Sequence, residues 1–238
     1  MRVERGLAGL RRADLNFEPR PLDWYTPERG WHADALVQRL PGEPPGDPTP
    51  GGPWTIARRL TEDYRMADPA LVRATWDAGR PLLGRDMLLE LRLWRLVSIH
   101  AGVRVTRVWD EDRVVDGRDE RVFGFEYATL AGHVERGRMD YEVAKRRDEG
   151  AVEFRLHAHS RASGDGAPWV RLGFRLFGRR EQLRFYRRCC ERIATLTARE
   201  LGLPAQPPPP AVHIQSAGAP DAAELRERLL PRRTRQER

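Results

Sequence analysis

The sequence predicts an α+β fold in which a curved antiparallel β-sheet, built as a meander, grips one long C-terminal helix. Residues 103–160 hold four segments that alternate apolar and polar residues, separated by short turn-like stretches, and this is typical of antiparallel strands. The segment Arg179–Leu201 instead repeats apolar residues at helical spacing. With 238 residues, of which 40% are hydrophobic and 32% charged, the chain can build one core of ordinary size.

The first elements of the body are a helix and a strand. Trp54–Met66 is predicted to be helical because Ile56, Leu60 and Tyr64 fall on one side at helical spacing. Met87–Trp94 fits both periods, and the alternation of its charged residues with leucines favours a strand. The later strands are expected at Val103–Trp109, Val122–Leu130, Arg138–Ala144 and Ala151–Ser160, followed by an apolar and basic segment, Trp169–Phe177.

The spacing of these strands predicts their register. A loop at residues 147–150 places Tyr141 opposite Leu156 and Val143 opposite Phe154. Pairing Leu130 with Arg138 would align Phe125 with Val143 and Tyr127 with Tyr141. One apolar face then forms from Phe123, Phe125, Tyr127, Thr129, Met139, Tyr141, Val143, Phe154, Leu156 and Ala158. The long helix offers Tyr186, Cys190, Ile193 and Thr197 to cover it.

We expect the folded body at residues 54–203, and the segments on either side of it differ from it in composition. Residues 1–40 form an N-terminal extension whose Trp24, Tyr25 and Trp31 are expected to pack on the body. Pro41–Pro53 is rich in proline and glycine and is interpreted as a loop. Residues 204–238 are predicted to be a Pro-rich, flexible basic tail with one short helix at Asp221–Leu230.

The composition limits the cellular setting. Charges interrupt the first residues too often for a signal peptide, and the longest uncharged stretch, Leu201–Pro220, contains too many prolines to span a membrane. The two cysteines, Cys189 and Cys190, are adjacent, which suits neither an ordinary disulfide nor a zinc site. We therefore expect a soluble cytoplasmic protein with no cofactor.

Residues 124–137, GFEYATLAGHVERG, resemble the signature of an uncharacterised family of bacteria and plants, the domain of unknown function "nineteen-ninety", whose pattern runs GF-x-YGTL-x-GH-x-E-x-GE. The expected SR pair follows as Ser160-Arg161, and the similarity covers roughly Val103–Ile193. Two positions depart from the pattern, Ala128 and Arg138. The layout is also similar to the helix-grip fold of START and polyketide-cyclase-like proteins, which implies an apolar small molecule held between sheet and helix.

The first functional hypothesis is therefore the binding of an apolar or amphipathic small molecule. The predicted cavity residues are Tyr127, Thr129, Tyr141, Phe154 and Leu156, with His133, Glu135, Ser160 and Arg161 at the polar end. A histidine near a carboxylate could instead serve acid–base catalysis in an enzyme of cyclase or hydrolase type, with His133 and Glu135 as candidates. A third interpretation is that these polar residues only brace the hairpin loop.

Two further sequence patterns bear on metal binding and on the binding of anions. His157 and His159 form an HxH pair that His133 could complete as a metal site, but the predicted register puts the pair on a solvated face with Glu153 and Arg155, and no metal site is predicted. Nine arginines and two glutamates lie between residues 171 and 199. A basic helix surface at Arg180, Arg184, Arg187 and Arg188 could bind nucleic acid or an anionic surface, which is the adaptor hypothesis.

Overall fold

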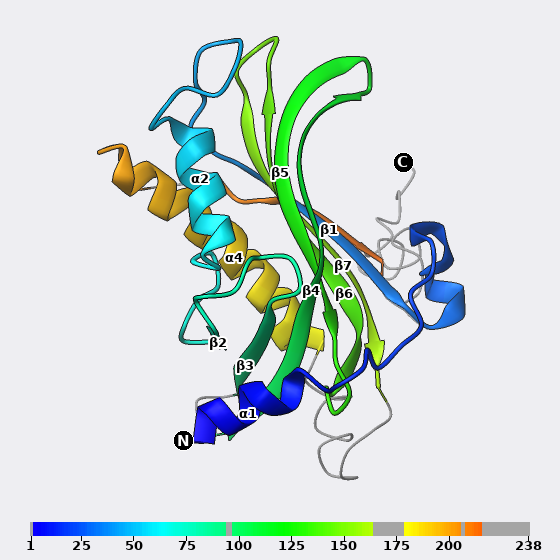
Figure 1. Cartoon of the computed structure of the whole chain (residues 1–238). Coiled ribbons are helices and arrows are strands. Elements are labelled where there is room, and N and C mark those ends of the chain that lie inside the picture. Colours follow the sequence, from blue (N-terminus) through cyan, green and yellow to red (C-terminus); the bar gives the residue numbers. More distant parts are fainter. Residues whose placement is uncertain (1, 94–96, 164–178, 206–207, 216–238) are drawn as a thin grey trace, which may run out of the picture.

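The computed structural model describes residues 2–93, 97–163, 179–205 and 208–215, and its centre is one eight-stranded antiparallel sheet (Figure 1). The strands lie in the order β2-β3-β4-β5-β6-β7-β1-β8. Their bounds are β1 His32–Arg39, β2 Val72–Trp76, β3 Asp86–Leu93, β4 Val97–Val115, β5 Arg118–Thr129, β6 Glu135–Arg146, β7 Val152–Ala162 and β8 Ala211–Gln215. Strands β2 to β7 follow one another as neighbours, so the predicted meander is confirmed. The expected segments Trp169–Phe177 and Asp221–Leu230 lie outside the described residues.

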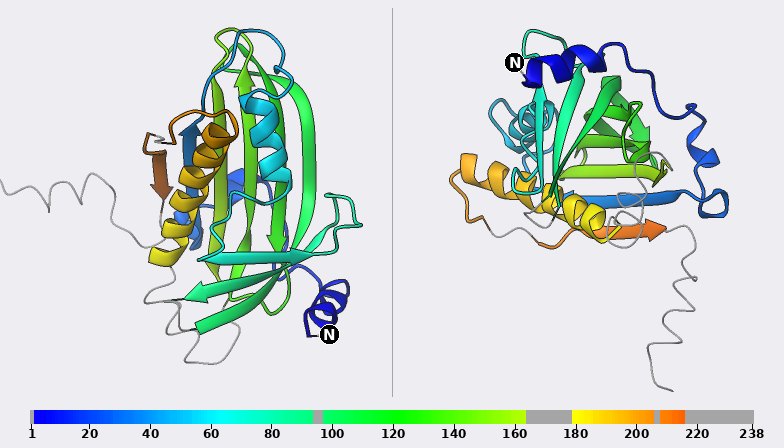
Figure 2. Two further views of the ribbon diagram at one scale, coloured as in Figure 1. Left: turned by 90° about the vertical axis from the view of Figure 1, so that its left-hand side faces the viewer. Right: turned by 90° about the horizontal axis from the view of Figure 1, so that it is seen from below.

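Two helices cover one face of the curved sheet (Figures 1 and 2). They are α2, Pro53–Glu62, and the long α4, Arg179–Glu200, which agrees with the predicted helix at Arg179–Leu201. A further helix, α1, Arg2–Leu10, lies beside β3. The arrangement is an α+β fold of helix-grip type, as the sequence predicts.

The helix predicted at Trp54–Met66 ends earlier than expected. Ile56 and Leu60 are buried in α2, but the helix stops at Glu62, and Tyr64 follows with a left-handed φ of 55°. Few residues other than glycine adopt this conformation, because the side chain then crowds its own backbone. The break turns Tyr64 inward, where its side chain is buried against the sheet.

The sheet also takes residues from both flanking segments. Strand β1 comes from within residues 1–40 and pairs with β7, with Leu36 opposite Leu156. Strand β8 comes from within residues 204–238 and pairs with β1. Two short 3-10 turns, Leu22–Trp24 and Pro27–Arg29, precede β1, and Trp24 of the first turn packs with Tyr25 and Trp31.

The registers were predicted with unequal success. The β6–β7 register is confirmed, with Tyr141 opposite Leu156 and Val143 opposite Phe154. The β5–β6 register is wrong by two residues: Phe125 lies opposite Tyr141, and Tyr127 opposite Met139. The cause is that Leu130 does not pair with β6. Its backbone N–H donates to Gly102 O (3.0 Å), and the residue forms a bridge with Leu15.

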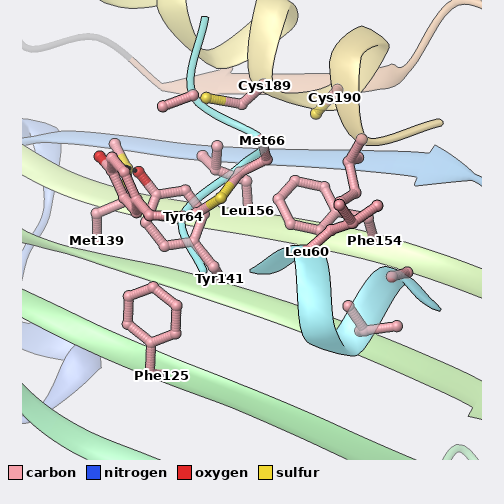
Figure 3. Close-up of a cluster of buried hydrophobic side chains, with 14 of the residues drawn as sticks. Leu60, Tyr64, Met66, Phe125, Met139, Tyr141, Phe154, Leu156, Cys189 and Cys190 are labelled. Atoms are coloured by element: carbon pink, nitrogen blue, oxygen red, sulfur yellow. Dashed lines mark hydrogen bonds between the residues drawn. The ribbon is translucent and has the colours of Figure 1, made fainter. Parts of the chain in front are cut away.

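The core lies between the sheet and the two helices. A shift of two residues keeps each side chain on its own face of the sheet, so the predicted apolar face survives the register error. Figure 3 shows Tyr141, Phe154 and Leu156 beneath α4, with Cys189 and Cys190 facing them from the helix. All ten predicted face residues are buried, as are the four predicted helix residues.

The only lysine of the chain, Lys145, is fully buried near the end of β6. Its Nζ lies 3.0 Å from Glu43 Oε1 and donates to the carbonyl oxygens of Pro44 (2.9 Å) and Asp47 (2.8 Å). All three partners belong to the Pro/Gly-rich loop at residues 41–53. The buried ammonium group therefore ties this loop to the sheet.

Candidate functional site

A cavity of about 110 Å³ opens between the first turns of α4 and the sheet. One wall is apolar or aromatic, and the other end carries ionisable and amide side chains. The lining residues are Tyr64, Leu71, Val72, Leu89, Leu91, Arg92, Tyr127, His133, Glu135, Met139, Glu181, Gln182, Phe185 and Tyr186. They come from the α2–β2 connection, from strands β2, β3, β5 and β6, from the β5–β6 loop and from α4, so the cavity depends on the whole tertiary fold.

The loop between β5 and β6 positions the polar end. Gly132 has a φ of 86°, a conformation that glycine adopts without steric cost, and the turn lets the His133 N–H donate to Leu130 O (3.1 Å). His133 Nδ1 in turn accepts the backbone N–H of Glu135 at 3.0 Å. The imidazole therefore contacts the backbone of Glu135 and not its carboxylate.

The N-terminal segment fixes the same loop from outside the meander. Asn16 Nδ2 donates to Glu135 O (2.7 Å), and the Thr129 hydroxyl donates to Asn16 Oδ1 (2.6 Å). The Thr129 oxygen also accepts the Gly137 N–H at 2.9 Å. Gly137 itself fits because a Cβ there would meet His159 O at 2.2 Å. These contacts hold the start of β6 and so set the position from which Glu135 reaches the cavity.

Helix α4 supplies the partner of the Glu135 side chain. Gln182 Nε2 donates to Glu135 Oε1 (2.8 Å) and to Ser160 Oγ (2.9 Å), while Gln182 Oε1 accepts from Arg179 Nη1 (2.7 Å). The amide is thereby fixed in one orientation with its oxygen toward Arg179. Within the described part of the chain, no arginine or lysine lies within ion-pair distance of the Glu135 carboxylate.

Arg179 has another anionic partner. Its two terminal nitrogens contact the two carboxylate oxygens of Asp34 at 2.5 and 2.6 Å, a paired geometry that gives strong charge-assisted hydrogen bonds. The Asp34 side chain is fully buried in β1. The pair joins the start of α4 to the middle of the sheet, next to the cavity.

Removal from water shifts the acid–base properties of the two polar-end residues in opposite directions. Burial raises the pKa of Glu135 to about 7, an effect that the Arg179 charge opposes and the Asp34 charge reinforces. Burial lowers the pKa of His133 to about 4. At neutral pH, His133 is therefore uncharged, whereas Glu135 is divided between its neutral and ionised forms.

Tyrosine hydroxyls form the inner part of the site. The Tyr141 hydroxyl lies 3.3 Å from that of Tyr64 and 3.4 Å from that of Tyr127. Burial raises the pKa of Tyr127 to about 12, and it raises those of Tyr64 and Tyr141 well above their ordinary value. All three phenols are therefore neutral hydrogen-bonding groups at physiological pH.

The structure brings together only some of the predicted site residues. Tyr127, His133 and Glu135 line the cavity, and Ser160 contacts it through Gln182. Tyr141, Phe154 and Leu156 are fully buried in the core behind it, and Thr129 is taken up by its contacts with Asn16 and Gly137.

Arg161 does not join the polar end. It lies on the opposite face of the sheet, with its guanidinium 5.6 Å from the centre of the Trp31 ring. Strand side chains alternate between faces, and Ser160 points toward α4, so its neighbour Arg161 must point away. The same parity places His157 and His159 on the outer face, in agreement with the prediction.

Sequence reasoning missed several functional positions. Gln182 and Phe185 lie on the predicted helix, but only the fold shows that they face the cavity. Tyr64 lines the cavity because α2 ends before it, and the helical pattern had assigned it to the helix face. Leu89 and Leu91 lie on β3, and no local sequence pattern shows that this strand lines a cavity together with α4.

The remaining candidates have these positions. Among the described residues, no cluster of histidine, cysteine, aspartate or glutamate has the geometry to hold a metal ion. Arg180, Arg184, Arg187 and Arg188 are all exposed on α4, where Arg184 pairs with Glu181 (3.3 Å) and Arg188 with Glu191 (3.1 Å). No helix in the described part of the chain combines the length and the apolar character needed to cross a membrane.

Comparison with known proteins gives a match to one family model. The family model described as a domain of unknown function (DUF1990) matches residues 21–192. Among curated proteins, none matches the sequence. Solved structures with a similar fold include Ara h 8.0201 (8% identity, TM-score 0.38, covering 69% of this chain and 98% of that one). A protein from Arthrobacter aurescens is also similar (6% identity, TM-score 0.42, covering 70% of this chain and 86% of that one). So is an uncharacterised protein from Rhizobium leguminosarum (12% identity, TM-score 0.32, covering 71% of this chain and 95% of that one).

Proposed function

The chain belongs to the family described as a domain of unknown function (DUF1990), and we propose that it binds a small amphipathic molecule in the cavity between the sheet and α4. The apolar part of the ligand packs against Leu89, Leu91 and Phe185. Its polar end meets Glu135 and His133. The observation that carries this proposal is a cavity with one apolar wall and one polar end, which contains an acid that no cation among the described residues pairs with.

The size of the cavity limits the ligand. Sites for drug-sized molecules usually enclose about 300–1,000 Å³. A volume of about 110 Å³ suits a compact molecule or one end of a longer one. The proposed ligand is therefore small, and a bulky lipid or polyketide would need the walls to move.

Glu135 favours ligand binding over a role limited to bracing the loop. The loop is already held by backbone contacts, by the His133 ring and by Asn16, none of which uses the Glu135 carboxylate. A carboxylate that only braced the loop would gain from a cation or from backbone N–H donors. Its single amide partner in the described structure, Gln182, supports a role directed toward the cavity.

Acid–base catalysis is the second candidate function. A carboxyl group with a pKa of about 7 in a cavity is suited to proton transfer at physiological pH, and this favours an enzyme of cyclase or hydrolase type. Glu135 would be its acid or base. His133 is less suited to that role because its Nδ1 is occupied by a backbone N–H and its pKa lies near 4.

Native mass spectrometry of freshly purified protein, followed by organic extraction, tests the binding proposal. The expected result is a discrete added mass that disappears on denaturation. A Leu91→Trp variant, which fills the cavity, should lose that mass. A matched Val114→Trp variant, changed at a side chain 67% exposed and outside the cavity wall, should keep it.

Two results would contradict the proposal. The first is an occupant that the Leu91→Trp variant retains. The second is an empty wild-type protein that also binds no member of a fragment library in ligand-observed NMR. If Glu135→Gln keeps the affinity for an identified occupant but loses its turnover, the enzyme alternative gains. Loss of affinity in the same variant favours binding.

A further inference from the structure

The described part of the chain pairs its buried carboxylates with cations almost without exception. Glu43 lies beside Lys145, Asp34 beside Arg179, and Asp86 beside Arg104. On the outer face of the sheet, Glu120 and Glu142 share Arg155, and Glu126 contacts Arg138. Because a buried negative charge is costly without a partner, this pattern is expected.

Glu135 departs from the pattern. Its Oε1 accepts one hydrogen bond from Gln182, and no cation of the described chain pairs with it. Gln182 cannot offer more, since its amide group already bonds to Ser160 and Arg179 as well. The carboxylate lies in the wall of a cavity, where a ligand can reach it. A cation that the described part of the chain does not supply can therefore come from the ligand.

We infer, building on the proposed function, that the polar end of the ligand is a small organic cation, a protonated or quaternary ammonium group. The Glu135 carboxylate supplies the counter-charge. The aromatic side chains of Tyr64, Tyr127, Phe185 and Tyr186 supply the surrounding wall. Glu181 also lines this cavity, but its carboxylate is paired with Arg184 (3.3 Å).

The aromatic wall is chemically suited to such a group. The face of an aromatic ring carries negative charge density and attracts an ammonium ion, most strongly where water is excluded. The wall tyrosines are neutral, since burial raises the pKa of Tyr127 to about 12 and raises those of Tyr64 and Tyr186 well above their ordinary value. Their rings, and not phenolate charges, would contact the cation.

The positively charged side chains near Glu135 are paired with other acids and do not neutralise its carboxylate. From α4, Arg179 is held in its two-point contact with Asp34 of β1, and Glu181 pairs with Arg184 at the rim. From β3, Arg92 lines the cavity but directs its Nε to Glu90 (3.1 Å). From the β5–β6 loop, His133 is neutral above a pKa of about 4. Each nearby cation thus has an acid of its own.

The direct test compares trimethylammonium compounds with neutral carbon isosteres of the same shape. Isothermal titration calorimetry would measure choline against 3,3-dimethylbutan-1-ol, and then a series of longer alkyltrimethylammonium ions against matched alcohols and hydrocarbons. These cations keep their charge at every pH. For the members that fit, the expected result is at least about tenfold tighter binding of the cation.

Variants assign that preference to one carboxylate. Glu135→Gln keeps the size of the side chain and should remove most of the preference for the cation, leaving only the smaller part that the aromatic rings contribute. Glu181→Gln removes a rim carboxylate from the same cavity and should leave most of the preference in place. Thermal unfolding would check that both variants fold.

The pH dependence gives a second readout. Cation affinity should fall about tenfold for each pH unit below the pKa of Glu135, which lies at about 7, and level off above it. In Glu135→Gln this dependence should disappear, which excludes the other charged groups as its source.

Distinct outcomes separate this inference from the proposed function. Neutral isosteres that bind as tightly as the cations would overturn the inference and leave the cavity proposal standing. A natural occupant that carries no positively charged nitrogen at neutral pH would do the same. If neither series binds and the purified protein is empty, both ideas fail.

Discussion

Strand β6 carries an ionisable side chain in the protein interior near each of its ends, and the two have opposite surroundings. Lys145 is fully buried and meets one carboxylate and two carbonyl oxygens. Glu135 meets one amide and faces a cavity. The lysine is fully partnered from within the chain and therefore serves the fold. The glutamate is only partly satisfied, and the structure supports a role for it outside the fold.

The difference shows how to read buried charges in a protein of unknown function. A buried charge that is saturated with partners costs the protein little once folded, and its removal breaks the structure. A charge left short of partners costs stability in the unliganded state. Such a cost is common at functional sites, where a ligand supplies what the fold omits.

The largest change in unfolding free energy is expected on replacing Lys145, whose buried charge has partners within the chain. Lys145→Met keeps the length of the side chain but leaves Glu43 buried without its cation, so we expect a loss of about 3–5 kcal/mol of unfolding free energy. Urea denaturation would measure it. The double variant Lys145→Met/Glu43→Gln should recover a large part of the loss. Equal stability of Lys145→Met and the wild type would remove the basis of the comparison.

Removing the charge at the other end of β6, on Glu135, is expected to stabilise the protein instead. Glu135 has a pKa of about 7 in the folded protein, above its value of about 4.3 in an unfolded chain. Between these values the unfolded state releases its proton while the folded state keeps it, so stability falls as the pH rises. Glu135→Gln should therefore stabilise the free protein by about 3–4 kcal/mol at pH 8 and by little at pH 4.

The same urea experiment at the two pH values checks this prediction. Glu181→Gln serves as the control, because its carboxylate is paired with Arg184 at the rim. A Glu135→Gln variant less stable than the wild type at pH 8 would mean that the carboxylate supports the fold, as Lys145 does.

A smaller change in unfolding free energy is expected from Gln182, whose amide group donates to the Glu135 carboxylate. Gln182→Met removes the donor to Glu135 Oε1 and to Ser160 Oγ while keeping the length of the side chain. Hydrogen bonds to charged groups contribute about 1.5–3 kcal/mol and those between neutral groups about 1. The loss should thus be about 2 kcal/mol at pH 8 and about 1 at pH 4. Gln215→Met, at an exposed position, should change neither value, and a loss independent of pH would contradict the assignment.

Much of the fold could be predicted because its signals are local. Alternation located the strands, and the short loop at residues 147–150 fixed the β6–β7 register. The β5–β6 register failed because Leu130 donates its N–H to Gly102 O and forms a β-bridge with Leu15, and both residues are far away in sequence. Strand β1 escaped notice because Asp34 interrupts its apolar pattern. Only the distant Arg179 makes that buried aspartate acceptable.

The site was less predictable than the fold for a related reason. His133 and Glu135 stand out in the loop sequence, but their partners Asn16 and Gln182 come from opposite ends of the chain. Arg161 was assigned to the site although strand parity, which is visible in the sequence, puts it on the other face beside Trp31. Tyr64 could not be placed, because its left-handed backbone depends on the packing around it.

The most direct test of the account is a carbon-13 NMR titration of the Glu135 carboxyl group in the free protein, assigned by comparison with Glu135→Gln. The account predicts a midpoint near pH 7, which falls when a bound ammonium ion supplies the missing charge. A midpoint near pH 4.3, as in an unfolded chain, would contradict it, because Glu135 would then be an ordinary carboxylate whose charge water already stabilises.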